Sequence, residues 1–445
     1  MTDNRRGPVA LLTRSRPEAG TRPRRTDVVM LLTCYLFLLM AIPSSLVVGP
    51  LGGAGAPAGL FAAVLLCWYM VAWQHPLLPL DRGKQPVRVV AALFGCATVA
   101  AYVSANRVAQ PVLTENGADR GLITLAGWLG VLLLAADGIE RPDGLTTLFR
   151  RIVMGSTAMA LLGIVEFFSG LNLASYIVIP GLSVHTQPGS LSVVEGLNRA
   201  TATTSQPLEL AAVLAISLPL AIHQAIFAAE AVRLRRWLQV AVIAVAMLMT
   251  VSRSAILGLA VIAIVLLPTW PKSYRHHAYR ALLAALVAGW LVEPKVLSSF
   301  GQLIGNIGTD TSISSRTQAY SSAVPYIAGH PWFGLGFQTF FPQTYFFVDN
   351  QYLTSLIETG FVGALSVLAL FVTGWFVARS ARRAACDTRT RDLMQCLAAS
   401  VAAAAVSFST FDALGFVIAP GLTFLMLGCV GAAWRLVRAQ RQSAS

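Results

Sequence analysis

The stretch that divides this chain reads SSFGQLIGNIGTDTSISSRTQAYSSAVPYIAGHPWFGLGFQTFFPQTYFFVDNQY and covers residues 298–352. It mixes polar and aromatic residues, whereas long apolar runs lie on either side. Backbone polar groups in lipid must pair within the spanning segment, so the apolar runs predict transmembrane helices and the stretch predicts a large loop outside the lipid. We expect the chemistry in this loop, because apolar spans offer few reactive groups.

The composition is that of a polytopic membrane protein. Hydrophobic residues make up 56% of the 445 residues and charged residues only 12%, about half the charged share of a soluble domain. The formal net charge of +13 comes from arginines in short clusters between apolar runs, which indicates membrane topology and not nucleic-acid binding. The cysteines show no metal-ligand spacing, so neither a metal site nor a disulfide framework is expected.

Segments of about 20 mainly apolar residues, the length of a spanning helix, predict an all-α transmembrane bundle of about 12 spans. The predicted spans are 28–48, 57–74, 87–105, 121–137, 152–169, 208–228, 237–251, 254–270, 280–297, 353–378, 393–411 and 416–435. Nine helices therefore occupy residues 28–297 and three occupy 353–435, with the large loop between them. An Arg-rich tail, 1–27, precedes a retained first helix, and 436–445 form the other tail.

Positive charge predicts the orientation of these spans. With both termini in the cytoplasm, all but six of the 33 Lys and Arg residues lie on the cytoplasmic side, as the positive-inside rule requires. This places a multi-pass protein in the cytoplasmic (inner) membrane, with the large loop on the extracytoplasmic side. The six remaining cations are Arg107, Arg120, Arg199, Arg253, Lys295 and Arg316.

Arg253 is the cation that topology explains least, because it lies between two long apolar runs. A charge near the bilayer costs about 2.5–3.5 kcal/mol on insertion scales. One interpretation is that Arg253 caps a re-entrant turn and extends to the surface. The other is that it lines a cavity and binds an anion.

Several polar motifs follow one another on the predicted outer face. They are RATAT at 199–203, QPLEL at 206–210, SRSA at 252–255, SR at 315–316, HPWFGLG at 330–336, DNQYL at 349–353 and ETGFVG at 358–363. In this order they resemble the O-antigen ligase and O-antigen polymerase superfamily, and the resemblance covers residues 195–375. It implies a membrane glycosyltransferase of cell-envelope polysaccharide biosynthesis that transfers a glycan from a polyprenyl-diphosphate donor, such as undecaprenyl diphosphate, to an acceptor hydroxyl. The implied partners are that lipid-linked oligosaccharide, a glycan, lipid or cell-wall acceptor, and membrane lipid, with no cofactor, metal or nucleic acid.

The resemblance also implies roles for single residues. Arg199 and Arg253 would bind the diphosphate, because guanidinium groups give bidentate donors to a charged leaving group without a metal. Arg316 would bind the diphosphate or a sugar hydroxyl. The acceptor needs a base, and Asp349 stands where ligases of the superfamily have His. The predicted substrate-binding set is Arg316, His330, Asn350, Tyr352 and Glu358.

Other interpretations of these residues remain open. Asp349 has the position of a cap for a helix that begins near Asn350, and Glu209 and Asp412 are alternative bases. His330 precedes a proline and fits a turn. Glu358 is expected to hold an arginine in place, and 315–329 is predicted to form an amphipathic helix on the outer surface.

Two other functions compete with the ligase or polymerase hypothesis. A transporter or flippase of lipid-linked oligosaccharide would bind the diphosphate with the same arginines without cleaving it, although the sequence shows no internal repeat. A non-catalytic assembly subunit would explain the missing His. Glycan transfer by purified protein separates these hypotheses.

Overall fold

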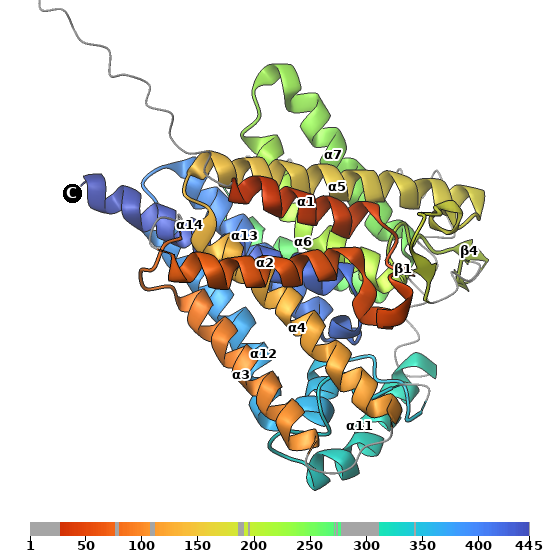
Figure 1. Ribbon diagram of the computed structural model, residues 1–445. Helices are drawn as coiled ribbons and strands as arrows, with labels where there is room; N and C mark the ends of the chain where they lie inside the picture. The colour runs from red at the N-terminus through yellow and green to blue at the C-terminus, as the bar shows by residue number, and fades with distance from the viewer. Residues whose placement is uncertain are drawn as a thin grey trace, which may run out of the picture.

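The computed structural model describes residues 27–75, 80–106, 112–185, 191–194, 196–270, 272, 275–276, 311–341 and 344–444. The predicted tail before residue 27 and the predicted ninth span, 280–297, lie outside the described residues. Within them the chain is an all-α bundle (Figure 1). Its helices are α1 (Val28–Ala41), α2 (Pro57–Gln74), α3 (Pro86–Ala105), α4 (Val112–Gly138), α5 (Pro142–Ser169), α6 (Pro207–Ile226), α7 (Glu230–Met249), α8 (Arg253–Leu266), α11 (Thr311–Gly329), α12 (Gln351–Ala384), α13 (Thr388–Ser407) and α14 (Ile418–Ala444).

The polytopic fold class is confirmed. Seven helices in the described part of the chain are long and apolar enough to cross a membrane: α2, α3, α4 from Asn116, α5, α6, α12 and α14 to Gln442. The total of about 12 spans stays a prediction. Several of these helices begin with a proline in the first turn, where its missing N–H costs nothing and its fixed φ favours the helix.

The most buried helices are α6 and α14. The apolar stretch of α14 is 89% buried and that of α6 is 83% buried, against 28% for α2. Helix α14 packs on α4, α12 and α6, while α6 also packs on α7, α8 and α13. Apolar residues around the whole circumference of α6 and α14 are consistent with this central position.

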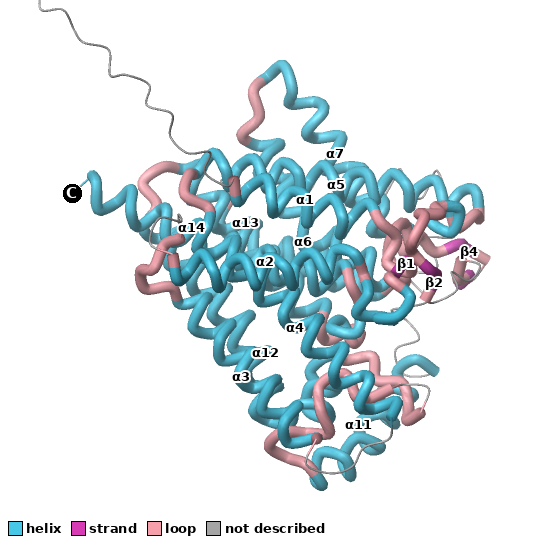
Figure 2. The backbone as a smooth tube through the Cα atoms, in the orientation of Figure 1, coloured by secondary structure: helices cyan, strands magenta, loops and turns pink. Residues whose placement is uncertain are grey.

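Short strands and 3-10 turns close one end of the bundle (Figure 2). Strand β1 (Leu46–Val47) pairs with β2 (Ser183–Val184), and β3 (Val193–Val194) pairs with β4 (Leu197–Asn198). The predicted first span, 28–48, is therefore too long, because α1 ends at Ala41 before a proline and the chain continues into β1. Helix α1 begins and α14 ends at the opposite end of the bundle (Figure 1).

The polar stretch before α12 is partly helical. The predicted amphipathic helix 315–329 corresponds to α11, which is followed by a loop that reaches α12. Figure 1 shows α11 beside the last turns of α3 and the first turns of α4, away from β4.

Candidate functional site

The segment 199–205 is held in place by a buried acid at the end of α5. One carboxylate oxygen of Glu166 accepts hydrogen bonds from the backbone N–H of Thr201 and of Ala202, at 3.1 and 2.7 Å. Its other oxygen accepts from the N–H of Leu173 at 3.1 Å. Glu166 is fully buried, so these donors satisfy a group that would otherwise be costly in the bundle.

Arg199 lies against the turn that carries Arg253. The Nε of Arg199 donates to the carbonyl of Thr250 at 2.9 Å, and the N–H of Ala200 donates to that of Met249 at 3.2 Å. Thr250 precedes α8, whose first residue is Arg253 and whose N-cap is Ser252. Both arginines are half-buried, and burial lowers the pKa of Arg199. The structure thus brings Arg199 to the Arg253 turn.

Backbone strain occurs in the Arg199 segment, in the Arg253 turn and just after the 330–336 motif. In the described chain, the non-glycine residues with positive φ are Ala202, Val251 and Gln338. Ala202 lies in the Arg199 segment, Val251 in the Arg253 turn, and Gln338 just after the 330–336 motif. Each such residue costs about 1–3 kcal/mol and persists where the surrounding structure requires it, often at functional sites.

The 330–336 motif docks on a break in α12. The N–H groups of Leu335 and Gly336 donate to the carbonyls of Ile357 and Glu358, at 2.9 and 2.8 Å. Gly360 has φ +62° and interrupts α12. A Cβ on Gly360 would lie 2.4 Å from the carbonyl carbon of Trp332, and a Cβ on Gly334 would lie 2.3 Å from that of Glu358, so both segments need a glycine where they cross.

Glu358 has a different partner from the expected arginine. Its carboxylate accepts from the N–H of Phe340 at 3.3 Å, and the backbone amides of Gln338 and Thr339 also bond to it. Glu358 is buried. It therefore orders the loop after the 330–336 motif, and its expected contact with substrate is not supported by this geometry.

Two of the predicted residues at the start of α12, Asn350 and Tyr352, make structural hydrogen bonds. Asn350 is the N-cap, since its Oδ1 accepts from the N–H groups of Tyr352 and Leu353. The interpretation of Asp349 as the cap is therefore wrong, because the neighbouring side chain fills that place. The hydroxyl of Tyr352 donates to the carbonyl of Ala405 at 2.8 Å, which joins α12 to α13.

Asp349 lies near a second acid, Asp412, in the loop between α13 and α14. Burial, together with a smaller contribution from the negative charge of Asp349, raises the pKa of Asp412 to about 7. The loop is anchored to α12, because the backbone N–H of Gln351 donates to the carbonyl of Phe408 and its side-chain oxygen accepts from the N–H of Leu414, at 2.8 and 2.7 Å.

Glu209 connects this loop to the arginine segment. One oxygen accepts from the N–H and hydroxyl of Ser205, at 3.1 and 3.3 Å. The other accepts from the N–H groups of Ile418 and Ala419, at 2.7 and 3.2 Å. Glu209 is fully buried and its oxygens serve these backbone groups, so its expected alternative role as a base is disfavoured.

The remaining predicted residues lie on the polar stretch. His330 is exposed at the end of α11, and its carbonyl accepts from the N–H of Gly334 in a turn. Arg316 belongs to α11, but its side chain lies outside the described residues. Sequence reasoning missed Glu166 and Gln351. The one available signal was Glu166 itself, a lone acid within an apolar span.

One group of possible metal ligands among the described residues lies away from the candidate site. His223, Asp392 and Cys396 have ligand atoms within 4.8 Å of one another, at the end of α6 and the start of α13. The Nδ1 of His223 already bonds to Asp392 at 2.7 Å, and the charge of Arg382 also acts on Asp392. A histidine–aspartate pair explains this group without a metal.

Residues 238–368 match the family model described as O-antigen ligase. The matched range includes the Arg253 turn, α11 and the break in α12, whereas Arg199 and Asp412 lie outside it. A comparison with curated proteins gave no match.

Proposed function

We propose, from the match of residues 238–368 to the family model described as O-antigen ligase, that the chain is a member of the O-antigen ligase and polymerase superfamily and transfers a glycan from a polyprenyl-diphosphate donor to an acceptor hydroxyl. The proposed location is the outer face of the cytoplasmic membrane. The observation that carries the proposal is the hydrogen bond from Arg199 to the carbonyl of Thr250. This bond holds the Arg199 guanidinium at the turn that carries Arg253. Two cations near the membrane surface suit a lipid diphosphate, because charge gathers on its oxygens as it leaves.

In the proposed reaction, the acceptor oxygen attacks the anomeric carbon and the bond from that carbon to the diphosphate oxygen breaks. The polyprenyl diphosphate leaves with the electron pair, and the acceptor proton passes to a carboxylate. Asp349 is the proposed base, because it stands where ligases of the superfamily have His. Asp412 is the second candidate, since a pKa of about 7 suits proton transfer near neutral pH.

The test uses the full chain in liposomes with a polyprenyl-diphosphate glycan and a candidate acceptor. We expect release of polyprenyl diphosphate together with glycan transfer. Asp349→Asn should abolish transfer while donor binding survives, and Asp349→His should keep part of the activity. Asp119→Asn, an exposed acid on the same predicted side, is the control. If Asp412→Asn abolishes transfer and Asp349→Asn leaves it intact, the base is Asp412.

Arg253→Lys tests the diphosphate site. A lysine keeps the charge but cannot give two parallel N–H donors, so transfer should fall at least tenfold. Arg383→Lys, an exposed site at the other end of α12, should leave turnover unchanged. Turnover of Arg253→Lys at the wild-type rate would remove Arg253 from the proposed site.

A transporter is the second candidate, because the break at Gly360 resembles the discontinuous helices of transporters. The same liposomes decide between the two functions. A donor that crosses the bilayer intact, with no glycan transferred, would support the transporter and reject the transferase.

A further inference from the structure

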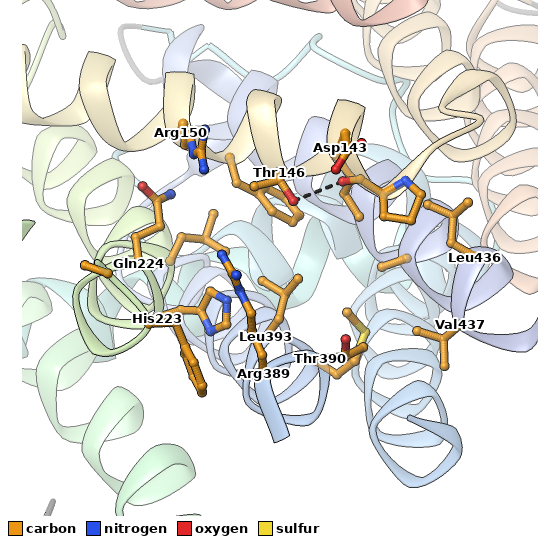
Figure 3. A pocket seen from close by; sticks show the side chains of 18 of the residues that line it. Asp143, Thr146, Arg150, His223, Gln224, Arg389, Thr390, Leu393, Leu436 and Val437 are labelled. Atoms are coloured by element: carbon orange, nitrogen blue, oxygen red, sulfur yellow. Dashed lines mark hydrogen bonds between the residues drawn. The ribbon is translucent and has the colours of Figure 1, made fainter. Parts of the chain in front are cut away.

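A pocket of about 570 Å³ lies at the end of the bundle where α5 begins, opposite the end of α5 that carries Glu166. Figure 3 shows side chains that line it. It is formed by the first turns of α5, α7 and α13 and the last turns of α6 and α14. The sequence predicts that this end faces the cytoplasm. The volume is in the range of small-ligand sites, about 300–1,000 Å³.

Three helices each contribute an arginine to the lining of the pocket. Arg150 of α5, Arg236 of α7 and Arg389 of α13 line it, whereas Asp143 is the one carboxylate among its described lining residues. The positive charges of Arg150 and Arg236 act on each other. Like charges gathered in this way favour an anion between them.

An uncompensated amide lies beside these arginines. Gln224 lines the pocket, and both its side-chain oxygen and nitrogen are buried without a hydrogen-bond partner among the described residues. Figure 3 shows Arg150, Gln224 and Arg389 around one half of the pocket. Buried amides without a partner are costly, and a bound ligand with polar oxygens would satisfy this one.

Apolar side chains also line the pocket, beside the polar groups of Thr146, His223, Thr390 and Gln440. Leu220, Phe227, Val232 and Leu393 contribute to the lining, and α7 beside it exposes Trp237 and other large apolar side chains. Tryptophan is enriched at the membrane interface. A ligand with a charged head and an apolar tail matches this combination better than a fully soluble anion.

We propose that this pocket binds the phosphodiester headgroup of an anionic phospholipid from the predicted cytoplasmic leaflet. The three arginines contact the phosphate, and the Gln224 amide bonds to a headgroup oxygen. The acyl chains leave along the apolar surface of α7. Arginines that serve only topology would also attract anionic lipids, but arginines outside the pocket would then contribute as much as those inside it.

The test is native mass spectrometry of the full chain in detergent, titrated with phosphatidylglycerol or phosphatidylcholine. We expect tighter binding of phosphatidylglycerol. An arginine near the membrane surface contributes about fivefold in affinity, so the triple variant R150Q/R236Q/R389Q should lose on the order of 100-fold. The triple variant R233Q/R383Q/R441Q removes the same charge outside the pocket lining and should stay near the wild-type affinity.

Equal losses in both triple variants would overturn the proposal. Glycerol 3-phosphate that binds as tightly as phosphatidylglycerol would also overturn it, because the site would then belong to a soluble phosphate. The single variant Arg389→Gln changes an exposed side chain, so it should fold even if the triple variant does not. An unchanged affinity for phosphatidylglycerol in this single variant would also reject the proposal.

Discussion

Asp412 makes the stability of the fold depend on pH. Its pKa is raised from 3.8 to about 7, so the folded state binds the proton more tightly than the unfolded state. The resulting stabilisation is present in full below pH 3.8 and is lost as pH rises through about 7, at no more than about 1.4 kcal/mol per pH unit. In Asp412→Asn we expect this loss to disappear.

Thermal unfolding in detergent between pH 5 and pH 8 measures the effect. The wild type and Asp119→Asn should lose stability over this range relative to Asp412→Asn. Parallel pH profiles of all three proteins would show that Asp412 does not titrate in this way.

Glu166 is a positioning residue for the Arg199 segment. In Glu166→Ala the N–H groups of Thr201 and Ala202 lose their acceptor, at a cost of about 1–3 kcal/mol for each buried donor. We expect a lower unfolding temperature and loss of glycan transfer, whereas Glu166→Gln, which keeps one acceptor oxygen, should restore part of both. Glu230→Ala, which removes an exposed carboxylate, is the control. Wild-type transfer by Glu166→Ala would exclude the positioning role.

The sequence identified the motif residues more easily than their contacts. Arg199 and Arg253 stood out because each is a cation that topology does not require, and the structure places Arg199 at the Arg253 turn. Glu358 also stood out, but only the fold shows that its partners are backbone amides. Gln351 carried no signal, since an uncharged side chain at a helix start has many ordinary roles.

Among the elements, the contact between α12 and the 330–336 motif is the most tightly constrained. Gly360→Ala would place a Cβ against Trp332 at a positive φ, which should destabilise the protein by about 2–4 kcal/mol. Gly329→Ala is the matched control, because nothing lies within 4 Å of its added Cβ. Its stability should change by less than about 1 kcal/mol. Equal unfolding temperatures for the two variants would contradict this account.

Hydropathy predicted the bounds of α2, α3 and α6 within two residues, because burial in lipid or in the bundle requires apolar residues along their length. Helices α4 and α5 begin nine and ten residues before the predicted spans, since their first turns carry polar residues that hydropathy does not include. It did not predict the break in α12, where apolar residues continue past Gly360. The pairing of β1 with β2 also could not be predicted from hydropathy, since it joins two-residue strands far apart in the sequence. Such contacts depend on tertiary packing, which periodicity does not record.

For the whole molecule, the predicted orientation is open to a labelling experiment. Cys386 is exposed in the linker between α12 and α13, and Ser321 is exposed on α11. With the other exposed cysteines replaced by serine, an impermeant maleimide should label Ser321→Cys in intact cells and leave Cys386 unlabelled. Labelling of Cys386 alone would invert the topology, and permeabilised cells provide the control for reactivity.

The bonds of Glu209 have a consequence for the order of synthesis. Two of its partners are the first amides of α14, separated from it by 209 and 210 residues. When α6 leaves the ribosome these donors do not yet exist, so only the oxygen that accepts from Ser205 has its partners, and a half-satisfied carboxylate is poorly tolerated in lipid. The start of α6 must therefore remain in contact with water until the last helix has been made. Assembly of this end of the bundle becomes a late, post-translational event.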